Sequence, residues 1–186
     1  MNRKMKKIEY FLFIWFIILN TFNIYFVSAT KVFSLKNDDY YFYNLDILIN
    51  NNQDDDLIIN FVDDYYDMSL AEPFNFGITV NHNIALIGNK NGTIFDYNNQ
   101  GRKGPFKVSI FSDSLTFENI TFTNFDQLSD NNVYMIAISA QTEQFHIYIN
   151  NCSFIENNYD LMVFNFNSKR IIEVDPQIQI NNTNFM

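Results

Sequence analysis

Three stretches of this sequence repeat at a nearly constant spacing. Leu115–Phe122 (LTFENITF) returns as Ile147–Phe154 (IYINNCSF) and as Ile178–Phe185 (IQINNTNF). A shorter copy, Ile84–Gly88, precedes the first by the same interval. The intervals are 32 and 31 residues. Self-similarity at a nearly fixed period of this length is typical of chains built from stacked structural repeats. The sequence therefore predicts a repeat architecture.

Within each copy, large apolar residues alternate with polar ones on both sides of one asparagine. In the first copy, Leu115 and Phe117 precede Asn119, and Ile120 and Phe122 follow it. Alternation with period two is typical of a strand with one buried face. Asparagine tolerates the left-handed backbone of a tight bend. Each copy is therefore expected to form two strands joined by a bend.

Stacking the copies places like residues in columns. The expected apolar columns are Leu115, Ile147 and Ile178; Phe117, Ile149 and Ile180; and Phe122, Phe154 and Phe185. The bends align in the same way, giving a structural ladder of Asn119, Asn151 and Asn182. A helix would not keep these registers across loops of differing length. The prediction is an all-β coil of parallel strands.

This pattern resembles the right-handed parallel β-helix of pectate-lyase-like proteins. More narrowly, it resembles Asn-rich secreted proteins of the β-helix type. The resemblance covers roughly positions 57–186 and rests on the period and the asparagine bend. It implies a right-handed solenoid and says little about chemistry, because solenoids of this kind have many roles.

Other apolar runs complete the expected coil. The additional strands predicted are Leu57–Val62, Gly77–Val80, Ile84–Ile87, Thr93–Asp96, Lys107–Phe111, Val133–Ser139, Leu161–Phe166 and Ile171–Val174. Together with the repeats they make about four to five rungs. Helical spacing of apolar residues predicts a capping helix over Asp39–Asn50 that covers the first rung. Thr30–Lys36 is expected to be extended or disordered, and Asp63–Met68 to be a loop.

The N-terminal segment 1–29 predicts a signal peptide. A basic start is followed by the apolar Ile8–Leu19, and Val27–Ala29 offers small residues for cleavage. The alternative is an uncleaved membrane anchor, because the segment 8–27 approaches spanning length. The expected organisation is a signal segment 1–29, an N-terminal segment 30–56 and a β-helix 57–186, in a secreted or cell-surface protein. The alternative localisation is membrane-anchored.

The net charge of the chain limits the classes of ligand that it is expected to bind. The segment 1–29 holds four of the 12 Lys and Arg residues and one of the 21 Asp and Glu residues, so 8 basic and 20 acidic residues remain, a net charge of −12. Such a chain repels nucleic acid, and it disfavours polyanionic sugars unless cations bridge them.

The single cysteine, Cys152, cannot form an internal disulfide. It takes the slot of Ile120 and Thr183, so a buried inert thiol is expected, with a reactive or intermolecular thiol as the alternative.

Candidate ligand sites are few. Asp63, Asp64 and Asp67 are candidates for binding calcium, although a solvated turn and loop is the simpler interpretation. No other cofactor is expected. His82 and His146 fall in different rungs, and neither has a second ligand nearby in the sequence, so structural or surface roles are expected.

No catalytic residues are expected. Polysaccharide-cleaving β-helices use clustered carboxylates, or Asp-bound calcium with a basic residue. Beyond the N-terminal segment the arginines are Arg102 and Arg170, and neither adjoins a repeating carboxylate. Asp113 and Glu118 do not form a recognisable acid–base pair either. These residues therefore favour a protein that is not an enzyme, without deciding the question.

The sequence contains candidate residues for carrying a glycan and for binding one. Among the four N-x-[ST] sequons, at Asn91, Asn119, Asn151 and Asn181, Asn91 is the glycosylation candidate because it lies in a predicted corner and not in the ladder. Exposed aromatic residues also stack on sugar rings. The tyrosines considered for this are Tyr65 and Tyr66 in the acidic loop and Tyr40, Tyr41 and Tyr43 in the cap, with core or cap packing as the alternative.

The function expected is adhesion or glycan contact through one long strand face of a solenoid without a catalytic site. A polysaccharide lyase or glycoside hydrolase of pectate-lyase-like type is the alternative, and a membrane-tethered fragment without independent activity is a third. The sequence stops at Met186 immediately after the last repeat. A truncated chain is the favoured explanation; end-to-end self-association and a fraying last rung are the others.

Overall fold

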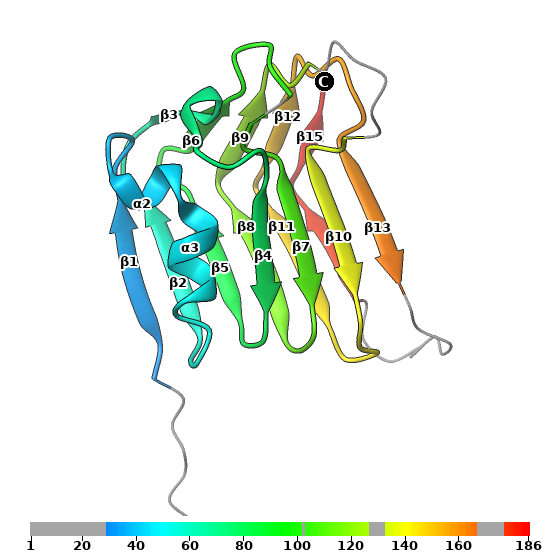
Figure 1. The fold of residues 1–186 in the computed structure, drawn as a ribbon. Helices are drawn as coiled ribbons and strands as arrows, with labels where there is room; N and C mark the ends of the chain where they lie inside the picture. The colour runs from blue at the N-terminus through cyan, green and yellow to red at the C-terminus, as the bar shows by residue number, and fades with distance from the viewer. Residues whose placement is uncertain (1–28, 102, 127–132, 167–176) are drawn as a thin grey trace, which may run out of the picture.

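The fold is an all-β parallel solenoid of about five turns, seen in a computed structural model that describes residues 29–101, 103–126, 133–166 and 177–186. Its axis runs from the N-terminal strand to the C-terminal strands (Figure 1). The strand pairs are parallel throughout the described ranges, and the strands fall into three sheets that the chain visits in turn. The predicted coil of parallel strands is therefore confirmed.

Three sheets form the walls of the coil. Sheet A contains β1 (Lys31–Leu35), β2 (Leu57–Phe61), β5 (Ile84–Ile87), β8 (Ser114–Glu118), β11 (His146–Asn150) and β14 (Ile178–Asn181). Sheet B contains β3 (Tyr65–Asp67), β6 (Thr93–Asp96), β9 (Ile120–Thr123), β12 (Ser153–Ile155) and β15 (Asn184–Phe185). Sheet C contains β4 (Phe76–Val80), β7 (Phe106–Ile110), β10 (Ile136–Ala140) and β13 (Met162–Phe166).

The predicted columns line the interior, and only their last members at the C-terminal end, among them Ile180 and Phe185, are exposed. Leu115 lies opposite Ile147, which in turn lies opposite Ile178. In sheet B the rings of Phe122, Phe154 and Phe185 follow one another in register. Alternate residues of each strand point inward, so the apolar half of the repeat makes one continuous core.

An asparagine with left-handed backbone forms each of the last three bends between sheets A and B. Asn119 has φ 57°, Asn151 has φ 52° and Asn182 has φ 50°, all in the left-handed region. The backbone N–H of Asn119 donates to the carbonyl of Asn150, and that of Asn151 donates to the carbonyl of Asn181. One turn earlier, Gly88–Gly92 takes the place of this single asparagine. Left-handed backbone is least costly for Gly and Asn, which explains the residue used at each bend.

The N-terminal helix differs from the prediction. It is divided into α2 (Tyr40–Tyr43) and α3 (Leu45–Asn50), because Asn44 leaves the helical region at φ −125° and ψ 47°. α3 lies beside β4, where a first strand of sheet C would lie (Figure 1). The side-chain amide of Asn50 donates to the Gly77 carbonyl and accepts from the Thr79 N–H. The segment therefore covers the edge of sheet C, while β1 forms the edge of sheet A.

Two strands were not predicted as such. β1 pairs along its whole length with β2, so the segment expected to be extended or disordered is ordered as a strand. β3 lies in the segment expected to be a loop, and its Tyr66 is fully buried. The Tyr66 hydroxyl donates to the Leu35 carbonyl, which ties β1 to β3. The sequence does not predict this strand for two reasons. Acidic residues flank it, and only one of its three side chains, that of Tyr66, points inward.

Several predictions concern residues outside the described ranges. These are the signal segment up to residue 28, the arginines at 102 and 170, and the strand expected at 171–174. Among the residues that are described, no helix combines the length and the apolar character needed to cross a membrane.

Candidate functional site

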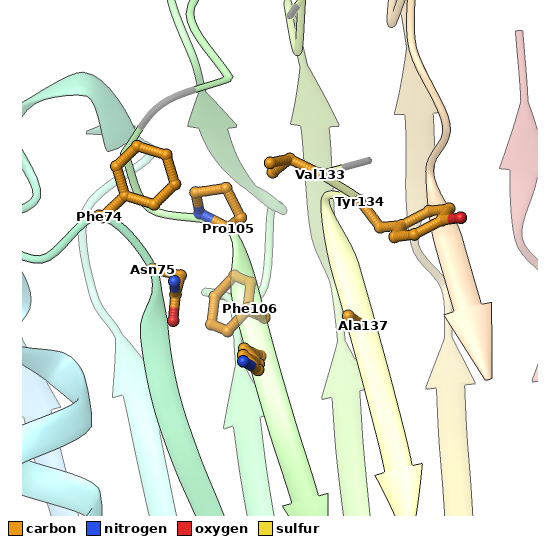
Figure 2. Close-up of a pocket in the computed structure, with 8 residues that line it drawn as sticks. Phe74, Asn75, Pro105, Phe106, Val133, Tyr134 and Ala137 are labelled. Carbon is orange, nitrogen blue, oxygen red and sulfur yellow. The ribbon is translucent and has the colours of Figure 1, made fainter. Parts of the chain in front are cut away.

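A hollow of about 210 Å³ lies on the outer side of sheet C, at the amino ends of β4, β7 and β10 (Figure 2). The side chains that shape it are Phe74, Pro105, Lys107, Val133, Tyr134 and Ala137. The rings of Phe74 and Tyr134 stand on opposite sides of it, with Pro105 between them (Figure 2). The hollow is therefore flanked by two aromatic rings.

The floor of the hollow is low because two of its strands carry small residues. Gly77, Lys107 and Ala137 are direct neighbours across β4, β7 and β10. All three point outward in strands whose inward residues are buried. A long lysine side chain thus lies between a residue without a side chain and one with a single methyl group.

Backbone hydrogen bonds fix the segments that carry the two rings. The N–H of Phe76 donates to the Pro105 carbonyl at 2.8 Å, and the N–H of Phe106 donates to the Met135 carbonyl at 2.8 Å. The carbonyl groups of Pro105 and Met135, which directly precede β7 and β10, therefore already accept hydrogen bonds from the neighbouring strands. Phe74 is 56% exposed, so its ring is available to a ligand without any rearrangement of the core.

Sheet C has no carboxylate on its described outward face. Its outward residues are Gly77, Thr79, Lys107, Ser109, Ala137, Ser139, Val163 and Asn165. Sheets A and B do carry outward acids, among them Glu118, Asp67 and Asp96. In the described part of the chain, basic and acidic side chains lie within 4 Å of each other at Lys31–Asp54 and at His82–Asp113, and the Lys107 ammonium takes part in neither contact.

A second hollow, of about 220 Å³, lies on the outer side of sheet A. Its polar lining includes Asp56, Asn83 and Ser114, and no aromatic residue lines it. Asn83 donates to the Asp56 carboxylate and accepts from the Ser114 hydroxyl at 2.7 Å. These polar groups satisfy one another, so this hollow offers a ligand less than the one on sheet C.

The three calcium candidates are engaged with different partners. Asp63 accepts from the Asn37 N–H at 2.8 Å, and Asp64 accepts from the Asn89 side-chain amide at 2.6 Å. Asp67 accepts from the backbone and hydroxyl of Ser69. Within the described ranges, no three His, Cys, Asp or Glu side chains gather closely enough to hold a metal ion. The three aspartates act here as hydrogen-bond acceptors that fix turns.

One pair of carboxylates does lie on adjacent strands, and it went unnoticed in the sequence because β3 was not recognised. Asp67 is the direct neighbour of Asp96 in sheet B. Asp96 accepts from the Tyr65 hydroxyl at 3.1 Å and from the Asn124 amide at 2.9 Å, and Asp67 accepts from the Asn98 amide at 2.6 Å. Burial, and then the nearby Asp96 carboxylate, raise the pKa of Tyr65. This pair is occupied by donors, which favours a structural role.

The histidines are partly exposed and lie two turns apart, beside β5 and on β11. His82 Nδ1 is 3.8 Å from Asp113 Oδ2, a carboxylate one turn later in the chain that sequence reasoning did not connect with it. The His146 ring stacks on Tyr148 on the outer face of sheet A, with centroids 5.9 Å apart. Neither arrangement contains the three ligands that a zinc site needs.

Cys152 and Asn91 occupy different environments. The Cys152 thiol is fully buried, and burial raises its pKa to about 11. Asn91 is exposed in the Asn89–Gly92 turn. The Thr93 hydroxyl of its sequon is buried and donates to the Asp63 carbonyl at 3.0 Å.

The aromatic residues of the sheet C hollow were missed by the sequence reasoning, although a signal exists. Phe74, Gly104 and Tyr134 each stand two positions before the first residue of a sheet C strand, and they are evenly spaced along the chain. This second register lies outside the asparagine repeat, so the repeat does not reveal it. Tyr65 and Tyr66, the tyrosines expected in the acidic loop, lie in sheet B, and Tyr66 belongs to the core.

Comparisons with protein-family models, with curated proteins and with solved structures found no match.

Proposed function

We propose that this chain is a non-catalytic, secreted or cell-surface β-solenoid that contacts glycans through the hollow on sheet C. The observation that carries the proposal is the pair of aromatic residues, Phe74 and Tyr134, on either side of Lys107 on a face without carboxylates among its described residues. Kinship with pectate-lyase-like β-helices belongs to the same proposal, and the parallel coil is its only support.

The chemistry of the hollow suits a sugar. Aromatic side chains offer flat apolar faces to the C–H groups of a pyranose ring, and a polar group nearby fixes its orientation. Lys107 can donate up to three hydrogen bonds to ring or hydroxyl oxygens. Cationic ligands are disfavoured by the same ammonium group. A polysaccharide that is neutral or modestly anionic brings no positive charge close to the Lys107 ammonium group. This is therefore the class of ligand that the hollow favours.

Affinity electrophoresis tests this function. The full chain is run through native gels that contain hydroxyethyl cellulose, xylan, glucomannan, glycol chitin or polygalacturonate. We expect retardation by at least one of these polymers. Phe74→Ala should weaken it about tenfold, the size expected for one stacking contact.

Phe111→Ala is the matched control, because Phe111 is 53% exposed and lies outside the hollow. This variant should bind as the wild type does. Equal losses in both variants would place the binding elsewhere, and a wild-type chain that no polymer retards would overturn the proposal.

The proposed location outside the cell is supported by the composition of the segment 1–29. N-terminal sequencing of the protein recovered from expressing cells checks it. A first residue of Thr30 in the medium or at the cell surface is expected. A chain that still begins at Met1 and remains with the membrane fraction would favour the anchored alternative.

A further inference from the structure

One bend between sheets A and B is longer than the bend that follows it. Between β5 and β6 the chain uses residues 88–92, whereas Asn119 alone makes the equivalent bend one turn later. Both ends of the longer bend are tied to that next turn, because the N–H groups of Gly88 and Thr93 donate to its carbonyl groups at 2.8 and 3.0 Å. The residues between these ties have no place in the stack of turns. Asn91, which is one of them, is exposed.

The fold does not use the side-chain amide of Asn91. Asn89 holds the turn instead: its Oδ1 accepts from the Asn91 N–H at 2.8 Å, and its carbonyl accepts from the Gly92 N–H at 2.9 Å. The Asn89 amide also donates to Asp64 at 2.6 Å. Among the described residues, no hydrogen bond involves the Asn91 side-chain amide. Its nitrogen can therefore carry a substituent without loss of a contact.

The other three N-x-[ST] sequons lie within the stack. Asn119 and Asn151 are direct neighbours on successive turns, about 4.8 Å apart. The Asn181 amide donates to the side chain of Asn150 at 3.0 Å. A glycan is bulky, so at any of these three positions it would crowd a residue of an adjacent turn.

The hydroxyl group that completes the Asn91 sequon is hidden in the folded chain. Thr93 is 0% exposed and points inward at the start of β6. Its hydroxyl donates to the Asp63 carbonyl at 3.0 Å and accepts from the Asn89 N–H at 3.0 Å. The sequon requires this hydroxyl two residues after the asparagine. The folded turn thus exposes the acceptor nitrogen and buries the group by which the sequon is recognised.

We propose that Asn91 carries an N-linked glycan, and that the glycan is attached before the Thr93 hydroxyl closes onto the Asp63 carbonyl. The inference rests on the location outside the cell proposed above, because N-glycosylation acts on secreted chains. It leaves the hollow on sheet C open, since none of the residues 88–93 lines that hollow.

The co-substrate is an oligosaccharide linked to a lipid through a diphosphate. A bond forms between Asn91 Nδ2 and the anomeric carbon of the oligosaccharide. The bond from that carbon to the diphosphate oxygen breaks, and the lipid diphosphate leaves with the electron pair. The amide gives up one proton to the departing diphosphate.

Cell-free synthesis of the full chain in the presence of microsomes tests the site. Protection from added protease reports entry into the microsomes. Enzymatic deglycosylation in heavy-oxygen water then converts each formerly glycosylated asparagine to a labelled aspartate, which peptide mapping locates. We expect the label at position 91 of the wild-type chain.

Variants of the turn identify the sequon as the cause. Asn91→Gln and Thr93→Val should lose the label, whereas Thr93→Ser should retain it because it keeps the hydroxyl. Lys90→Gln is the matched control, since Lys90 is an exposed neighbour in the same turn. It should be labelled as the wild type is. Loss of the label in this control as well would overturn the assignment to the sequon.

A second measurement tests the order of attachment and folding. Chain made without microsomes is given to the solubilised transferring enzyme and its lipid-linked donor, either folded beforehand or diluted directly from urea. Folding beforehand should lower the labelling of Asn91 at least about tenfold, because only the locally opened fraction exposes the Thr93 hydroxyl. Equal labelling of the two forms would overturn the proposed order.

The outcomes separate the modification from the location on which it rests. A protected chain without the label at position 91, or with labels only at the other three sequons, would overturn the glycan at Asn91 and leave the location intact. A chain that remains outside the microsomes would overturn both. Glycan contact through sheet C is decided independently by the electrophoresis described above.

Discussion

The ring of Phe122 lies flat against the ring of Phe154, with centroids 4.9 Å apart and planes 6° from parallel. Phe185 continues the column at 5.0 Å and 7°. In-register parallel strands are about 4.8 Å apart, so identical side chains in the same rotamer stack at this distance. The repeat thus produces a ladder of aromatic rings along the core.

Truncation of the middle ring should be costly. Phe154→Ala leaves a cavity between Phe122 and Phe185, and we expect it to lower the free energy of unfolding by about 3–5 kcal/mol. Urea denaturation followed by circular dichroism measures the change. Tyr148→Ala, on the outer face of sheet A, is the control and should cost about 1 kcal/mol or less. Equal losses would show that the column does not carry the core.

Two glycines provide a matched test of the bend that begins at Gly88. A Cβ on Gly88 would lie 2.1 Å from the Asn119 carbonyl oxygen, whereas one on Gly77 would meet nothing within 4 Å. Gly88→Ala should therefore destabilise the fold by about 1–3 kcal/mol or more, because backbone must move. Gly77→Ala should be neutral or slightly stabilising in the same urea titration. A harmless Gly88→Ala would contradict the close approach of these turns.

One bend carries a residue poorly suited to it. Glu156 has φ 56°, at the position equivalent to Asn124 with φ 57°. Because left-handed backbone is less costly for asparagine, Glu156→Asn should stabilise the chain by up to about 1 kcal/mol. Differential scanning calorimetry should show a higher Tm. Glu72→Asn, at a position without positive φ, should leave Tm unchanged, and a lower Tm for Glu156→Asn would refute the argument.

Alkaline pH should weaken the fold through two buried groups. Burial raises the pKa of the Cys152 thiol from 9.0 to about 11 and that of Tyr66 from 10.0 to about 12. The unfolded chain therefore releases these protons first as pH rises. The stabilisation is fully present below pH 9 and is lost as pH rises through 11 and 12. Urea midpoints measured from pH 8 to 11 should fall, and the fall should begin at a higher pH in Cys152→Val.

The asparagine repeat predicted most of the fold because each copy encodes the same local structure. Alternating apolar residues around Asn119 specify two strands and a bend, and the constant period specifies their stacking. β3 and the break at Asn44 were missed for a different reason. Tyr66 has few apolar neighbours in sequence, and its burial depends on Leu35 and Phe42 from the preceding turn.

The sequence by itself determined the parallel coil, its period and its asparagine bends, because these depend on residues within one repeat. Only the tertiary structure decided which outward residues share a face. Phe74, Lys107 and Tyr134 come from three turns, and their approach depends on the register of β4, β7 and β10. That register is set by the core and by the lengths of the loops between strands. A local sequence pattern cannot specify it, because loop length moves a residue around the coil without changing its neighbours in the chain.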